Sequence, residues 1–132
     1  MDLKILKIAS NTDNHKVVKN YTHQSKGVNP LCGDEMEISL LIKNEIIEDV
    51  GYQCKSCIYC QASASMLSQK IKNKKIEEIK NLISSVEYLF NDIEIKIENK
   101  WIGFKEILNK KNISRKECLL LPFKTTSKAL KF

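Results

Sequence analysis

The segment of residues 52–70, YQCKSCIYCQASASMLSQK, constrains this chain more than any other stretch. It places Cys54, Cys57 and Cys60 directly before a run of small residues that opens a predicted helix over residues 61–73. A thiol beside a helix N-terminus lies next to unpaired N–H groups and the positive end of the helix dipole, and both favour the thiolate. The thiolate is the form that binds metal and attacks sulfur, so we expect this segment to carry one of these two chemistries.

The length of 132 residues predicts a single domain over residues 1–132 that can bury a hydrophobic core without cross-links such as disulfides to stabilise it. No apolar run is long enough to span a membrane, and the lysine-rich N-terminus does not resemble a signal peptide. We therefore expect a cytoplasmic protein in which five reduced cysteines serve metal or sulfur chemistry. The net charge of +6 comes from scattered lysines without a concentrated basic face. We expect neither nucleic acid nor a membrane as a partner.

Apolar periodicity predicts two consecutive strands and several helices. Alternation over residues 36–42 and again near residues 46–52 predicts a hairpin with its loop at residues 43–45. Recurring apolar residues over 76–90 predict a long amphipathic helix. We also expect a helix over 2–10, a short strand within 17–28, either a strand or a connection over 93–97, and a short helix after Gly103. The last helix is expected to have Ser114 and Glu117 as a capping box. This helix either kinks at Pro122 or becomes regular only near it.

The predicted hairpin brings together cysteines that are far apart in the sequence. Its outer ends lie side by side, so Cys32 before the first strand comes near Cys54 and Cys57 after the second. Gly33 lets the backbone turn tightly between Cys32 and Asp34.

Three ligand arrangements fit these cysteines. Cys54, Cys57 and Cys60 have the spacing of a ferredoxin-like loop, but the fourth ligand and its following proline are missing. A zinc knuckle needs two close ligand pairs, and the second pair is absent. The third arrangement takes one cysteine from each of three loops together with Asp34. That set of three thiolates and a carboxylate suits zinc or the edge of an iron–sulfur cluster.

Three segments together carry a resemblance to a known family. The motif NPLCGD at residues 29–34 precedes the hairpin, Cys57 is followed by QASASM at residues 61–66, and Cys118 comes before a terminal helix. The combination resembles the U-type iron–sulfur cluster assembly scaffolds, which comprise IscU, SufU and the N-terminal part of NifU. It covers about residues 27–75 well and the terminal segment more loosely. The long spacing from Cys57 to Cys118 fits the SufU-like branch, which carries an insertion there.

The resemblance implies an α+β fold with a small antiparallel three-stranded sheet, helices packed on one face and the metal site at one end. It implies that Cys32, Asp34, Cys57 and Cys118 hold a transient iron–sulfur cluster or a zinc ion. The implied partners are a cysteine desulfurase, which supplies sulfur as persulfide with Cys118 as the acceptor, and apo iron–sulfur proteins, which receive the cluster. Such a chain is a scaffold rather than an enzyme, unless accepting persulfide is counted as sulfurtransferase activity.

The sequence departs from that family at several positions. Glu117 stands where the IscU branch has a histidine ligand, and residues 113–116 lack the proline-rich segment that the IscU branch presents to its chaperone. Cys54 and Cys60 are additional to the family pattern, and they could store sulfur, join the site or do neither.

Two further functions fit the same sequence. One is a zinc-dependent sulfur-transfer protein of the SufU type that accepts persulfide from a desulfurase. The other is a metal-free binding module that docks nucleic acid or protein through its basic surface. Metal content separates these alternatives, because a structural or catalytic zinc stays bound through purification.

Overall fold

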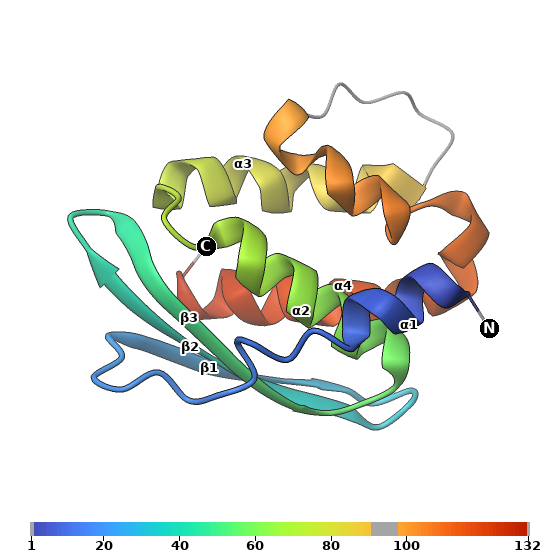
Figure 1. Ribbon diagram of the computed structural model, residues 1–132, viewed down its shortest axis with the longest axis horizontal. Helices are drawn as coiled ribbons and strands as arrows, with labels where there is room; N and C mark the ends of the chain where they lie inside the picture. The colour runs from blue at the N-terminus through green and yellow to red at the C-terminus, as the bar shows by residue number, and fades with distance from the viewer. Residues whose placement is uncertain (1, 91–97, 132) are drawn as a thin grey trace.

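The computed structural model describes residues 2–90 and 98–131 of the chain, and Figure 1 shows helices stacked over a sheet. The sheet has three strands in the order β1-β2-β3, and both neighbouring pairs are antiparallel. The elements are α1 (Leu3–Ala9), β1 (His23–Asn29), β2 (Asp34–Lys43), β3 (Ile46–Lys55), α2 (Ile58–Ile71), α3 (Ile76–Val86), the 3-10 segments η1 (Glu87–Phe90), η2 (Asn99–Glu106) and η3 (Lys110–Arg115), and α4 (Lys116–Ala129).

The hairpin of β2 and β3 closes through a two-residue turn. Asn44 and Glu45 both have positive φ, +54° and +62°, which is the type I′ geometry that matches strand twist. The strand register shifts at Leu41, so that Ile47 and Val50 both face the core although they are three positions apart. This bulge explains why the apolar residues of β3 do not alternate strictly in the sequence.

Helices α2 and α4 cover one face of the sheet (Figure 1). Helix α4 lies directly on β1, because Gly27 has no side chain where a Cβ would meet the Thr125 hydroxyl. The Ser25 hydroxyl also donates to the Thr125 carbonyl at 2.9 Å. In α2 the small residues Ala62 and Ala64 are buried, which lets this helix approach its neighbours closely. The resulting core lies between the sheet and the helices.

The segment after α1 covers β3 and part of the opposite face of the sheet. The backbone N–H of Val18 donates to the Ser39 hydroxyl at 2.9 Å. Gly51, the partner of Ser39 in the β2–β3 ladder, leaves room for the Lys16 carbonyl. The absence of a Cβ at residue 51 is therefore what lets this segment lie flat on the sheet.

The α+β fold with a three-stranded antiparallel sheet and helices on one face is confirmed. The hairpin and the helix at the N-terminus are also present, and the strand expected within 17–28 is β1, which continues one residue further to Asn29. Helix α2 begins at Ile58, three residues earlier than expected, so Cys60 lies inside it. Strand β3 continues to Lys55 and includes Cys54.

The expected ends of the later helices need correction. The amphipathic helix is α-helical only to Val86 and then tightens into η1, while η2 is a 3-10 segment that contains Gly103. The expected capping box is wrong, because the N-cap of α4 is Arg115 and it makes no side-chain cap bond. Glu117 instead pairs with Lys124 at 3.1 Å. The undecided stretch 93–97 lies outside the described residues.

Within residues 2–90 and 98–131, no helix combines the length and the apolar character needed to cross a bilayer.

Replacing Gly51 by alanine should lower the free energy of unfolding by about 1–3 kcal/mol, because the new Cβ overlaps the Lys16 carbonyl and the backbone must move. Gly103→Ala is the matched control, since its Cβ meets only the tip of the Lys70 side chain at 3.5 Å. We expect the control to stay within about 0.5 kcal/mol of the unchanged protein. Urea unfolding monitored by circular dichroism measures both, and equal midpoints would show that segment 14–18 is loosely attached.

Candidate functional site

The loop between β1 and β2 presents Cys32 to solvent. Asn29 shapes this loop, because its backbone carbonyl accepts from the Gly33 N–H at 2.8 Å and its side-chain oxygen accepts from the Leu31 N–H at 3.1 Å. Gly33 has a φ of +75°, in the left-handed region that glycine adopts without strain. The Cys32 side chain is exposed at the tip of the loop. The sequence motif around Cys32 therefore encodes a turn that positions a thiol.

Asp34 is the first residue of β2, and its side chain is hydrogen-bonded to the start of α2. Its Oδ1 accepts the backbone N–H of Cys57 at 2.9 Å, and its Oδ2 accepts from the Cys57 thiol at 3.4 Å. Cys57 is the N-cap of α2 and makes no side-chain cap bond of its own. The Asp34 carboxylate therefore pairs an N–H group at the helix start that would otherwise lack a partner.

Hydrogen bonding keeps the Asp34 carboxylate ionised although only 4% of the residue is exposed. Burial raises the pKa of this group, but the Cys57 N–H and the surrounding thiols of Cys32, Cys118 and Cys57 donate to it and outweigh burial. The net pKa of Asp34 lies below its ordinary value. A fixed negative charge is thus available where the thiols meet.

Cys118 lies in the first turn of α4, and only 5% of it is exposed. Its Sγ lies 3.6 Å from the Sγ of Cys32. Burial raises the pKa of the Cys118 thiol, and the neighbouring Cys57, Asp34 and Cys32 raise it further. Burial and these neighbours therefore favour the protonated form of this thiol.

Cys32, Asp34 and Cys118 each offer one ligand atom, and these atoms lie within 4.8 Å of one another. Cys57 adjoins this group through its contacts with Asp34. The β2–β3 register pairs Glu35 with Lys55, which confirms that the hairpin gathers its two outer ends. The structure therefore brings together the ligand atoms of three of the four predicted ligands, Cys32, Asp34 and Cys118, and places the thiol of the fourth, Cys57, against the Asp34 carboxylate.

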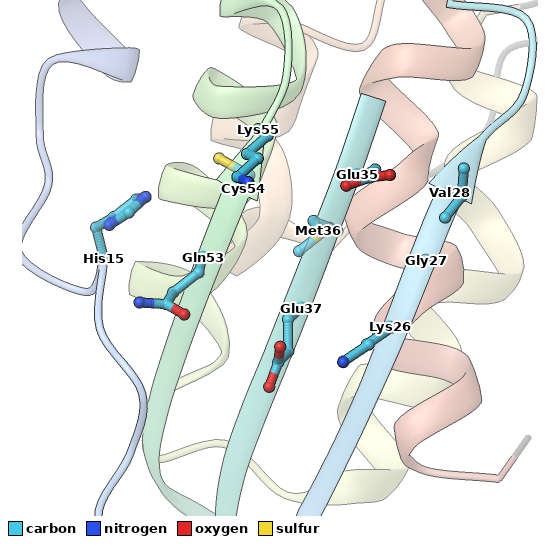
Figure 2. A pocket seen from close by; sticks show the side chains of 10 residues that line it. All are labelled: His15, Lys26, Gly27, Val28, Glu35, Met36, Glu37, Gln53, Cys54 and Lys55. Carbon is cyan, nitrogen blue, oxygen red and sulfur yellow. The ribbon is translucent and has the colours of Figure 1, made fainter. Parts of the chain in front are cut away.

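The two additional cysteines lie elsewhere. Cys60 is fully buried inside α2, where burial raises the pKa of its thiol to about 12. Cys54 lies on β3 and borders a hollow of about 480 Å³ that is also lined by His15 and by residues of β1 and β2 (Figure 2). Among the described residues, neither Cys54 nor Cys60 belongs to the group of convergent ligand atoms. His15 packs edge-on against Tyr52, with ring centroids 5.2 Å apart.

Two contacts that join α2 to α4 were not visible in the sequence. The fully buried Ser63 hydroxyl donates to the Leu119 carbonyl at 2.6 Å, one residue after Cys118. The Arg115 guanidinium lies over the Tyr59 ring at 5.2 Å, between the starts of the two helices. A small-residue run and a lone Tyr give no signal for such pairings, because their partners are more than fifty positions away.

Pro122 lies inside α4, four residues after Cys118. Proline has no backbone N–H, so the Cys118 carbonyl lacks the intrahelical donor that residue 122 would otherwise provide. The helix continues through this position, and the Thr126 hydroxyl donates to the Pro122 carbonyl at 2.8 Å. Of the two expectations for this proline, the one in which the regular helix begins only near Pro122 is wrong, because α4 begins at Lys116.

Comparisons with known proteins identify the family of this chain. The family described as NifU-like N terminal domain matches residues 2–103. The iron-sulfur cluster assembly scaffold protein IscU of Thermotoga maritima is 32% identical over 109 residues, which cover 80% of this chain and 75% of that protein. The zinc-dependent sulfurtransferase SufU of Bacillus subtilis is 41% identical over 49 residues, or 37% of this chain and 33% of its own length.

Solved structures share the same fold. The N-terminal NifU-like protein from Brucella abortus superposes with a TM-score of 0.88 over 98% of this chain and 91% of its own, at 17% identity. FiSufU from Fervidobacterium islandicum gives a TM-score of 0.86 at 26% identity and covers 98% of this chain and 96% of its own. Relatives of both the IscU and the SufU name match, so the SufU-like branch stays a prediction. The chain belongs to the NifU-like N-terminal domain family, alongside IscU- and SufU-type proteins.

Proposed function

We propose that this protein is a scaffold on which an iron–sulfur cluster is assembled and from which it is passed to apo iron–sulfur proteins. The observation that carries the proposal is the convergence of the ligand atoms of Cys32, Asp34 and Cys118 within 4.8 Å, with Cys57 beside Asp34. Thiolates are the preferred ligands of iron–sulfur clusters. A relative named as an iron-sulfur cluster assembly scaffold protein supports the same function.

The sulfur comes from a cysteine desulfurase in the cytoplasm and is accepted as persulfide on Cys118. Burial of Cys118 supports this role, because a persulfide at this position is shielded from competing reactions in solution. Cys32 is the exposed thiol of the group and lies in contact with Cys118. Iron then enters as the second component of the cargo, replaces the thiol protons of the cysteines and binds the ionised Asp34 carboxylate.

The mixed ligand set favours release of the cargo. Cysteine sulfur is a soft ligand, whereas the Asp34 carboxylate is a hard one that suits other ions better. A cluster bound through three thiolates and one carboxylate is therefore held firmly enough to assemble and loosely enough to leave.

A second function is supported by the relative named zinc-dependent sulfurtransferase SufU. Three thiolates and a carboxylate also make a tetrahedral zinc site. In that case Cys32, Asp34, Cys57 and Cys118 hold zinc, and the protein accepts and transfers persulfide without building a cluster.

Metal and sulfide analysis of Cys57→Ala beside the unchanged protein tests the ligand set and separates the two functions. The substitution removes one sulfur but keeps the backbone N–H that Asp34 accepts, so the start of α2 is retained. We expect metal affinity to fall by about tenfold to a hundredfold. Anaerobic reconstitution followed by iron, zinc and acid-labile sulfide analysis measures the loss. Iron with sulfide in the unchanged protein supports the scaffold, and tightly bound zinc without sulfide supports sulfur transfer.

Cys54→Ala is the matched control for this measurement. It removes a half-buried thiol three positions away that does not belong to the converging group. We expect it to keep the metal and sulfide content of the unchanged protein. An equal loss in both variants would mean that the ligand set includes Cys54 and has been assigned wrongly.

Asp34→Ala should slow transfer of the cluster to an apo-acceptor by roughly tenfold, a change of the size that altered ligand surroundings produce in metal sites. The reason is that the remaining thiolates hold iron without the hard oxygen ligand. Asp34→Asn separates ligation from structure, because an amide oxygen still accepts the Cys57 N–H but is no longer a carboxylate. Transfer rates monitored by visible absorption decide the matter, and identical rates for all three proteins would contradict this role.

A further inference from the structure

Cys32 and Cys118 form a pair of thiols in direct contact. Their Sγ atoms are 3.6 Å apart, although the residues come from the β1–β2 loop and from α4. The Cys57 thiol donates to the Asp34 carboxylate at 3.4 Å, and it is not part of the group whose ligand atoms all lie within 4.8 Å of one another. The Sγ of Cys32 is therefore placed to react with the Sγ of Cys118.

The two members of this pair differ in their freedom to move. Cys118 lies in a helix, and the Ser63 hydroxyl fixes the next residue through the Leu119 carbonyl. Cys32 is exposed at the tip of a short loop that includes Gly33. Two sulfurs join when they approach to about 2.05 Å. The loop can make most of that movement while the helix stays in place.

We propose that Cys32 resolves a persulfide carried by Cys118 and thereby releases its outer sulfur as hydrosulfide. This inference rests on the proposed function, because it requires that Cys118 accepts sulfur. It adds a reductive step within the protein itself. The sulfur that arrives in the persulfide state leaves in the sulfide state, which is the form found in a cluster.

The step balances without an added oxidant or reductant. The Cys32 thiolate attacks the inner sulfur, Sγ of Cys118, and a Cys32–Cys118 disulfide forms. The bond between Cys118 Sγ and the outer sulfur breaks, and that sulfur leaves with the electron pair and takes up the proton that Cys32 lost. The outer sulfur is reduced and the two cysteines are oxidised. Attack on the inner sulfur is the step that the 3.6 Å contact prepares, because it joins the two Sγ atoms themselves.

The disulfide product leaves the site oxidised. The Cys32–Cys118 bond must be reopened before the site can bind metal or accept sulfur again. Thiol–disulfide exchange with a dithiol reductant is the class of reaction that does so. The exposed position of Cys32 makes its sulfur the accessible point of attack.

The test uses metal-free protein under anaerobic conditions, loaded with one equivalent of glutathione persulfide and then separated from the donor. Intact mass spectrometry should first show the gain of one sulfur and then, with time, the loss of that sulfur together with two hydrogens. Peptide mapping should place the resulting disulfide between Cys32 and Cys118, and released sulfide should match the disulfide formed. Cys32→Ser should keep its persulfide and release sulfide at least about tenfold more slowly, because the internal nucleophile is gone.

Cys54→Ser is the matched control and should behave as the unchanged protein does. If Cys118 gains no sulfur in the unchanged protein, both its role as acceptor and this inference fail. If Cys118 gains sulfur but Cys32→Ser releases sulfide at the same rate, only this inference fails and the proposed function stands. A disulfide between Cys118 and Cys57 would also overturn it.

Discussion

The hydrogen bond from the Cys57 N–H to the Asp34 carboxylate is the interaction on which the site depends. At 2.9 Å it joins the first residue of β2 to the N-cap of α2, and so fixes the start of the helix beside the thiols. The carboxylate accepts hydrogen bonds from this N–H and from the neighbouring thiols, and it therefore stays ionised although it is buried. One side chain thereby fixes the position of the proposed ligand Cys57, pairs an N–H at the helix start and supplies a negative charge that would attract a cation.

Much of this arrangement can be predicted from the sequence, for identifiable reasons. The alternation in β2 and the cysteines flanking the hairpin predict which residues meet, because a hairpin must place its outer ends side by side. The motif around Gly33 predicts the tight turn at Cys32. The position of Cys118 could not be obtained in this way. It depends on packing of α4 against β1 and on the bond from Ser63 to Leu119, which link residues far apart in the chain.

The differences between prediction and structure also have physical causes. The sequence pattern places Cys60 before the predicted helix, but helix α2 begins at Ile58 and directs Cys60 into the core. The capping box at Ser114 does not form because η3 leads directly into α4 and leaves no extended residue at the helix start. In both places the local pattern is compatible with two structures, and packing against other elements selects between them.

Pro122 has a consequence for the chemistry that we propose at Cys118. In an uninterrupted helix, displacing the turn that holds this residue would break the bond from its carbonyl to the N–H four residues later. In α4 this hydrogen bond is absent, because residue 122 is a proline without a backbone N–H. Extra atoms on the sulfur therefore break no intrahelical hydrogen bond at the Cys118 carbonyl, while the bond from Ser63 to the Leu119 carbonyl keeps the start of α4 in place.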